Sequence, residues 1–413
     1  MISAQYKKLK LLTINELLII LFPITVLIGS FAINTYLILI SIIFLFSLII
    51  KKIEIKFLNQ YWFFLCLIFI VYNIINSFFA VDQFNAFRSS IGQLRFLFLS
   101  LFLMFFIKNF KNLDYIIRVW FVIVIFISLD LIFQNFFSYS IVGIPISISN
   151  RPSSFFEEEV VAGAFLTFLS LPIFFYLMND FNNFKKSKKI LYLLLYFLIL
   201  SAITLTGERI SLLTFLVISL VIFFIFFDLK KKLIILFSFT VFFAINYNFN
   251  IIFQKRIMDM INILKDIYHS SWGRLWESSY MLFKDNFLFG VGLKNYRVVC
   301  DSLVDPRPYH PAQFCSSHPH NFLLEILSET GLVGFLIFYT FFITLIFKLS
   351  KIYQTNFKEN KILLLIIGHL LILFNYVWPL KTAGSFFSTY NGAFFWLSLG
   401  IILFCNKNIK ATK

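Results

Sequence analysis

The sequence predicts an all-α polytopic integral membrane protein with about 12 transmembrane helices. Hydrophobic residues make up 60% of the 413 residues and charged residues only 14%, whereas soluble domains are close to half apolar and a quarter charged. Windows of apolar residues recur along the chain at the length that crosses a bilayer as a helix. Lysines gather in short segments between these windows, as expected for loops on one side of a membrane.

The apolar windows give the predicted spans in chain order. The first window is longer than the core of a signal peptide and has no small-residue cleavage site, so we interpret it as an uncleaved span. The windows are Thr13–Gly29, Asn34–Ile50, Tyr61–Phe79, Gly92–Ile107, Tyr115–Phe136, Val160–Met178, Ile190–Leu205, Ile210–Phe227, Leu233–Tyr247, Asn321–Phe347, Ile362–Leu380 and Ser385–Cys405.

Lysine placement predicts the orientation of the spans. Counting twelve spans puts every lysine cluster on one side, which the positive-inside rule makes cytoplasmic, together with both termini. We therefore expect a bacterial inner-membrane protein embedded in the lipid bilayer. The net charge of +16 comes from these loops and not from a basic face with interleaved aromatics, which excludes nucleic-acid binding. The clusters fall within residues 7–10, 51–56, 108–111, 185–189, 230–232, 348–361 and 407–413.

One long loop, Asn248–Pro319, separates the ninth and tenth spans and is predicted to lie on the opposite, periplasmic side. Apolar residues at helical spacing predict an amphipathic helix over Gln254–Tyr268. Ser271 is expected to cap a second helix that continues to Phe283. We divide the chain into N-terminal helices (1–205), a central region (206–347) that includes loop 248–319, and C-terminal helices (348–413).

The four cysteines fall into two groups. Cys66 and Cys405 lie in apolar runs, which is typical of packing residues. Cys300 and Cys315 lie in the long loop, where an oxidising compartment would allow a disulfide.

The motif His318-Pro319-His320-Asn321 lies where the loop meets the tenth span. Pro319 disfavours helical geometry at His318, so His320 or Asn321 is expected to cap the following helix. One interpretation is that these residues only cap the helix. The other is that His320 is a general base at the mouth of the bundle, oriented by His318. The residues alone leave both open.

Eight arginines lie away from the lysine-rich side. Arg209 lies close to membrane depth, where a charge is costly unless it is paired or functional. It either pairs with Glu208 or binds an anionic head group through its planar fork. Arg274, at the start of the second loop helix, can pair with Glu277 one helical turn away. The full set is Arg88, Arg95, Arg151, Arg209, Arg256, Arg274, Arg297 and Arg307.

Other polar residues give weaker indications. Arg88 and Arg95 share a face of the fourth span, where snorkelling explains them equally well. Glu159 either ends a solvated loop or orients a histidine or arginine. His369, within the eleventh span, is interpreted as a buried polar residue. The histidines match no strong zinc spacing, and phosphate-binding, nucleophile-elbow and dinucleotide motifs are missing, so we expect no metal and no cofactor.

Together these motifs resemble the O-antigen ligase family, part of a superfamily with O-antigen polymerases and bacterial O-oligosaccharyltransferases. The most specific resemblance is His320-Asn321 followed by Gly331 and Gly334, glycines that also predict close helix packing. It covers roughly Thr206 to Phe335, and the N-terminal half is similar mainly in span layout. The other matching stretches are Thr206-Gly207-Glu208-Arg209, Trp272-Gly273-Arg274-Leu275-Trp276, Asn286 to Leu293 with Gly290 and Gly292, and, more loosely, Arg151 to Phe156.

The resemblance implies an inverting, metal-independent glycosyl transfer at the periplasmic face. The donor would be a glycan on undecaprenyl diphosphate, and the acceptor a sugar hydroxyl of the lipid A core. His320 matches the family's essential histidine, while Arg209 and Arg274 match arginines that hold the diphosphate. Supporting candidates are His318, Asn321, Glu159, Arg88 and Arg95.

Three other functions remain open from the sequence. Within the superfamily, a polymerase would extend the glycan on its own carrier, and a protein O-oligosaccharyltransferase would transfer it to protein. From a different class, a transporter or flippase should have broken spans or ionisable groups near the midplane.

Overall fold

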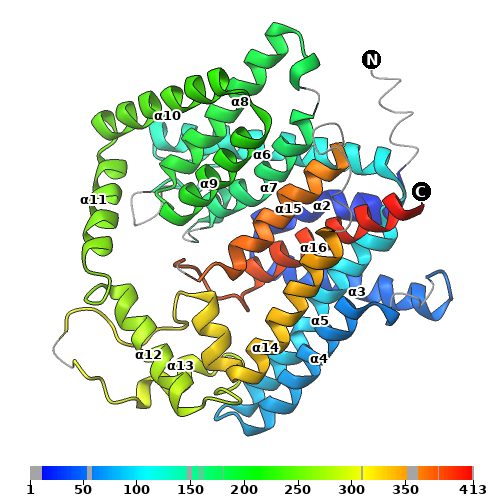
Figure 1. Ribbon diagram of the computed structural model, residues 1–413, viewed down its shortest axis with the longest axis vertical. Coiled ribbons are helices and arrows are strands. Elements are labelled where there is room, and N and C mark those ends of the chain that lie inside the picture. The colour runs from blue at the N-terminus through cyan, green and yellow to red at the C-terminus, as the bar shows by residue number, and fades with distance from the viewer. Residues whose placement is uncertain are drawn as a thin grey trace.

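The structure is a computed structural model that describes residues 12–53, 58–146, 151–157, 159, 161–179, 181–307, 310–350, 361–379 and 381–411. These residues form an all-helical protein without strands, apart from one isolated bridge between Tyr139 and Pro145. Figure 1 shows the helices in chain order. They are α2 (Ile14–Ile28), α3 (Ser30–Ile49), α4 (Tyr61–Asn76), α5 (Gln83–Phe106), α6 (Phe110–Phe137), α7 (Ala162–Met178), α8 (Lys186–Leu205), α9 (Arg209–Phe226), α10 (Leu229–Phe249), α11 (Ile251–Lys265), α12 (Ser271–Asp285), α13 (Tyr296–Val299), α14 (Phe322–Ser350), α15 (Lys361–Val377) and α16 (Thr389–Ala411).

Seven helices within the described residues are long and apolar enough to cross a membrane: α3, α4 with its 3-10 extension (Ser77–Phe79), α5, α6, α8, α14 and α16. Helices α10 and α11 meet these criteria only as a pair bent by 102°, which makes an eighth span if the pair is counted as one. Helices α2, α7, α9 and α15 are shorter apolar helices. Each predicted window overlaps a helix in its described residues. The polytopic all-α class is therefore confirmed, whereas the count of twelve spans stays a prediction.

The orientation also stays a prediction. Of the lysines that suggested it, Lys7, Lys8, Lys10, Lys56, Lys351, Lys358 and Lys413 lie outside the described residues.

Helices from the first half of the chain pack against helices from its last quarter. Helix α16 lies along α5, α15 along α7, and α14 along α4. Ser100 of α5 donates a hydrogen bond to the Trp396 carbonyl of α16 over 2.5 Å, which gives a buried hydroxyl its partner within the apolar core. The bundle therefore brings the loop between α15 and α16 to the start of α14.

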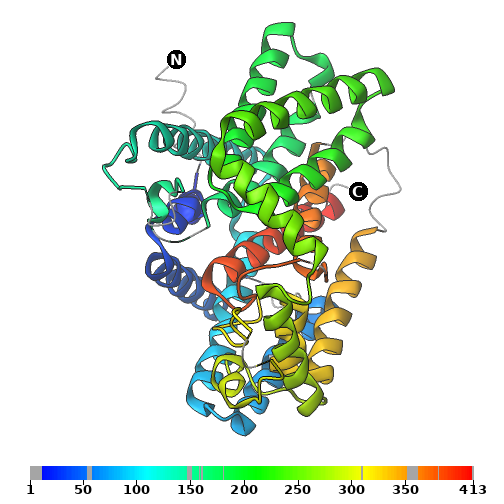
Figure 2. The same ribbon diagram turned by 90° about the vertical axis from the view of Figure 1, so that its left-hand side faces the viewer.

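The long loop lies at one end of the bundle. Figures 1 and 2 show α11 leading from α10 to α12, and α12 with the following loop beside the ends of α4 and α5. The two predicted loop helices are present as α11 and α12, although the cap of α12 is Ser270, whose hydroxyl accepts from Gly273 N, and not Ser271. Cys300 and Cys315 are joined by a disulfide.

Helix α14 is broken at Gly331, where φ is 63° and ψ is −174°. This backbone conformation is essentially restricted to glycine. The break is filled by the backbone of residues 287–292, so Gly331 serves a loop and not the helix packing that we expected. Gly334 does serve helix packing, because it faces Tyr72 of α4. Val291 N and Gly292 N donate to the carbonyls of Ser328 and Glu329, while Leu332 N and Val333 N donate to those of Phe287 and Leu288.

We expect Gly331→Ala to lower the free energy of unfolding by about 2–6 kcal/mol, because the new Cβ adds backbone strain and overpacking. That Cβ would lie 2.4 Å from the Leu288 carbonyl oxygen. Thermal unfolding in detergent micelles measures the change. Gly143→Ala is the matched control, because Gly143 also has a positive φ but has nothing within 4 Å of a Cβ. Equal destabilisation by the two substitutions would contradict the close contact between Gly331 and the backbone of residues 287–292.

Candidate functional site

A cavity of about 770 Å³ lies among α7, α9, α11, the loop before α14 and the loop between α15 and α16. Six cationic side chains and two carboxylates line it, together with His318 and His320. This excess of positive charge, set partly in apolar walls, favours an anionic ligand. The cations are Arg151, Arg209, Arg256, Lys294, Arg297 and Lys381, and the carboxylates are Glu159 and Glu208.

The turn at His320 and Asn321 joins α14 to the α15–α16 loop. Asn321 caps α14, because its Oδ1 accepts from Leu324 N at 3.1 Å. The same side chain donates from Nδ2 to the Pro379 carbonyl at 2.7 Å. His320 has a positive φ of 54°, and its carbonyl accepts from Ala383 N at 2.7 Å. The cap and the candidate base are therefore neighbours with separate tasks.

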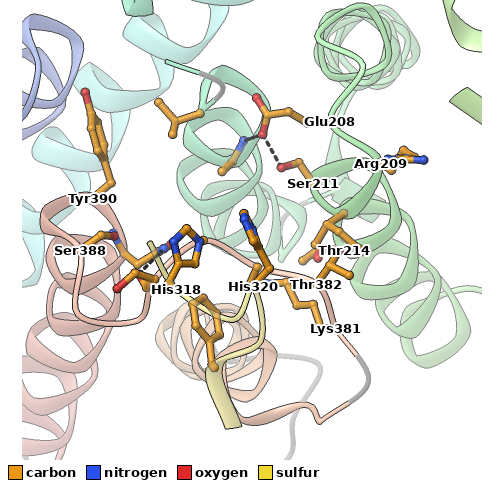
Figure 3. Close-up of a pocket in the computed structure, with 18 of the residues that line it drawn as sticks. Glu208, Arg209, Ser211, Thr214, His318, His320, Lys381, Thr382, Ser388 and Tyr390 are labelled. Atoms are coloured by element: carbon orange, nitrogen blue, oxygen red, sulfur yellow. Dashed lines mark hydrogen bonds between the residues drawn. The ribbon is translucent and has the colours of Figure 1, made fainter. Parts of the chain in front are cut away.

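The two imidazoles lie side by side, with ring centroids 4.0 Å apart (Figure 3). Trp272 packs edge-on against His320 at 5.1 Å. Burial lowers the pKa of His318 to about 3, helped by the positive charges of His320, Lys294 and Arg297. Burial also lowers the pKa of His320, although a hydrogen bond with the Ala383 backbone acts in the opposite direction. Both rings are therefore neutral at pH 7, and His320 is free to accept a proton.

Glu208 does not neutralise Arg209, which corrects one of the two sequence interpretations. Its carboxylate accepts from Gly163 N (2.6 Å), Ala164 N (3.0 Å) and Ser211 Oγ (2.7 Å). The first two are amides that the start of α7 leaves without helical partners. Burial raises the pKa of Glu208 to about 7, against the lowering effect of these hydrogen bonds. Figure 3 shows Glu208 directed toward Ser211.

Arg209 is left available at the cavity wall. Its Nη1 is buried and makes no hydrogen bond to the described part of the chain. Asp259 of α11 attracts the guanidinium electrostatically. Because a buried N–H group without a hydrogen-bond acceptor is costly, this arrangement favours a ligand that accepts hydrogen bonds.

Arg151 reaches the cavity through an anchored loop. Gln134 Oε1 of α6 accepts from Ser153 N (2.8 Å) and Ser154 N (2.7 Å). The carboxylate of Asp130, also buried in α6, accepts from the Ser154 hydroxyl. This explains the looser motif that begins at Arg151: its serines hold the loop and its arginine faces the cavity.

Arg274 lies elsewhere. Its side chain is 0% exposed, is paired with Asp305 and Glu277, and has its Cζ 4.7 Å from the centre of the Phe314 ring. The alternative of a pair with Glu277 is therefore observed, and Arg274 is not among the residues that line the cavity. It instead joins α12 to the segment around residue 305, and this contact lowers the pKa of Asp305 against the effect of burial, which raises it.

Arg88 and Arg95 of α5 do not line the cavity either. The Arg95 guanidinium donates to the Gly92 carbonyl at 2.5 Å and lies 4.3 Å from the centre of the Phe96 ring. Glu159 does line it. His369 is buried in the bundle beside Ser398. No group of three or more His, Cys, Asp or Glu that could hold a metal ion is present among the described residues.

Sequence reasoning missed several cavity residues. Arg151, Arg256 and Arg297 belonged to the noted set of arginines but had no assigned role. Lys294 and Lys381 gave no signal, because a lysine in a loop looks like any solvated charge.

These observations define the class of protein. It is a multi-pass membrane protein with a cationic, histidine-containing cavity among helix ends and the loops that join them. Residues 194–339 match the sequence profile of a family described as O-antigen ligase. The matched range includes Arg209, His318 and His320, and supports the resemblance drawn from the sequence. It indicates a membrane glycosyltransferase of the O-antigen ligase or polymerase type. No curated protein matches the chain.

We expect Arg274→Met to destabilise the protein by about 1–3 kcal/mol, because Asp305 loses its guanidinium partner, while Glu277 keeps its ion pair with Arg307. Thermal unfolding should shift to lower temperature, while the folded fraction keeps its affinity for pyrophosphate. Arg297→Met, at an exposed guanidinium on the cavity rim, should leave the unfolding temperature unchanged. An unaltered melting temperature with weakened pyrophosphate binding would instead place Arg274 in the ligand site.

Proposed function

We propose that the protein transfers a glycan from a polyprenyl diphosphate to a sugar hydroxyl, with undecaprenyl diphosphate as the carrier and the lipid A core as the acceptor. The observation that carries this proposal is one cavity that holds a neutral imidazole, His320, and the guanidinium of Arg209, whose buried Nη1 has no hydrogen-bond acceptor among the described residues. The profile match over residues 194–339 supports it. The reaction would take place at the periplasmic face of the inner membrane.

The chemistry follows from these two groups. His320 accepts the proton of the incoming hydroxyl, whose oxygen attacks the anomeric carbon of the donor sugar. The bond from that carbon to the diphosphate oxygen breaks, and its electron pair leaves with the diphosphate. Attack from the side opposite the leaving group inverts the anomeric centre. Negative charge grows on the leaving oxygen, so the guanidinium of Arg209 stabilises the transition state more than the ground state.

The neighbouring groups support this assignment. Arg151 and Arg256 share the cavity with Arg209 and extend its positive field toward the second phosphate. His318 packs against the His320 ring at 4.0 Å, and its pKa of about 3 makes it a poor proton acceptor at neutral pH. We therefore assign the base role to His320 and a packing role to His318. Neither step uses a nucleotide.

The competing function, a transporter, predicts broken membrane spans. Two helical segments of the structure are interrupted. Helix α14 is interrupted at Gly331, and α10 and α11 meet at a 102° bend. The backbone groups at the α14 break, however, are closed by hydrogen bonds to residues 287–292. Glycosyl transfer accounts better for the charges, which gather around His320.

His320→Ala should lower glycan transfer by about 10²-fold or more, because it removes the proton acceptor. The test is complementation of a strain that lacks the gene, with surface glycans separated on a gel and the variant's membrane level measured. His269→Ala is the control, because His269 is an exposed loop histidine paired with Asp266. Normal glycan attachment by His320→Ala would contradict the base assignment.

The same strain separates the acceptors. Loss of long chains from the core with accumulation of carrier-linked polymer indicates a ligase. A core that carries a single repeat indicates a polymerase, and unchanged lipid glycans with unglycosylated protein indicate a protein oligosaccharyltransferase.

The fall in transfer rate that comes from protonation of His320 should appear only below pH 6.5. Neutral His320 is the active form, and its pKa lies below the ordinary value of 6.5, so protonation begins only in more acidic solution. Initial rates of the purified enzyme above and below this pH check the prediction. A decline with a midpoint above pH 6.5 would show that another group, or a differently placed His320, controls the rate.

A further inference from the structure

Lys381 is a cavity side chain that no motif identified. It lies in the loop between α15 and α16 and lines the cavity beside His320 (Figure 3). The loop is attached on both sides of Lys381: Asn321 Nδ2 donates to the Pro379 carbonyl, and Ala383 N donates to the His320 carbonyl, each over 2.7 Å. The position of Lys381 is therefore fixed relative to the candidate base.

The ammonium of Lys381 makes no ion pair or hydrogen bond that the structure shows between described residues. Its nearest recorded partners are the faces of Phe322 and Tyr376, whose ring centres lie 5.3 and 5.8 Å from Nζ. Burial lowers the pKa of Lys381 to about 7, with no carboxylate to oppose the effect. A half-buried ammonium without a counterion is destabilised.

Lys294 lines the same cavity and provides a comparison, because its positive charge is compensated within the protein. Its Nζ donates to Ser385 Oγ over 2.5 Å, and Ser385 in turn donates to the buried carboxylate of Glu325 over 2.5 Å. Lys294 therefore has a negative partner within the protein. Lys381 has no such partner among the described residues, although Ser385 is only four positions further along the chain.

We propose that Lys381 binds a phosphoryl oxygen of the ligand that occupies the cavity. A phosphoryl group would supply the missing negative charge, and the aromatic faces of Phe322 and Tyr376 hold the ammonium in place meanwhile. The phosphoryl group belongs either to the donor's diphosphate or to a phosphorylated acceptor sugar, and its assignment to one of these substrates rests on the proposed function.

The test measures binding to the full-length protein in detergent by titration calorimetry, with inorganic pyrophosphate and glucose 1-phosphate as probes. Lys381→Met keeps the aliphatic stem and removes the charge, so we expect affinity for at least one probe to fall by about 10-fold or more. Lys381→Arg should stay within about 3-fold of the wild type. Lys284→Met, at the end of α12 and outside the cavity-lining set, should leave both affinities unchanged.

The two probes distinguish the sources. Loss of pyrophosphate binding alone assigns Lys381 to the donor, and loss of glucose 1-phosphate binding alone assigns it to a phosphorylated acceptor. Wild-type affinity of Lys381→Met for both probes would overturn the proposal. Thermal unfolding provides a second readout: the empty Lys381→Met protein should be at least as stable as the wild type, because an uncompensated charge is gone, and a large loss of stability would show a structural role.

Failure of this inference and failure of the proposed function give different results. Weakened pyrophosphate binding by Lys381→Met in a protein that attaches no glycan would support the phosphoryl contact and reject glycosyl transfer. Normal binding of both probes in an enzyme that transfers glycans would reject the contact and retain the function.

Discussion

A charge withdrawn from water at the edge of a bilayer must be hydrogen-bonded, neutralised or left for a ligand, and this constraint sorts the polar residues of the protein. The Glu208 carboxylate is satisfied by the start of α7, and Arg274 by two carboxylates. In contrast, Arg209 Nη1 has no hydrogen-bond acceptor and Lys381 has no ion pair among the described residues, and both side chains line the same cavity. Structural charges are thus paired, while the incompletely paired charges gather around the two histidines.

The same principle explains what could be predicted from the sequence. Helix positions follow from apolar windows of bilayer length. The lipid bilayer requires each spanning segment to be apolar and helical, independently of the neighbouring segments. Asn321 as a cap and Ser270 near the predicted cap are equally local features. The His320 motif could be found because it consists of adjacent residues: a histidine that follows a proline at the boundary of a span.

Long-range pairing could not be predicted in this way. Asp305, 31 residues from Arg274, takes that arginine out of the cavity, and no local pattern announces the contact. Glu208 looked like a partner for the adjacent Arg209 but instead reaches Gly163, 45 residues away. Lys381 becomes notable only when the fold places it beside His320 and away from carboxylates. The charges that carry function are distinguished by missing partners, and a partner is a property of the folded chain.

The closure of the α14 break has a consequence for how the protein tolerates change. The segment 287–292 is attached through main-chain amides and carbonyls on both sides of Gly331, while the side chains of Phe287, Leu288 and Phe289 remain about half exposed. Substitutions that preserve an apolar surface should be accepted at these three positions. The spacing is inflexible, because one added or deleted residue would put one pair of amide–carbonyl matches out of register with the other. Segment length, more than segment composition, is what this junction constrains.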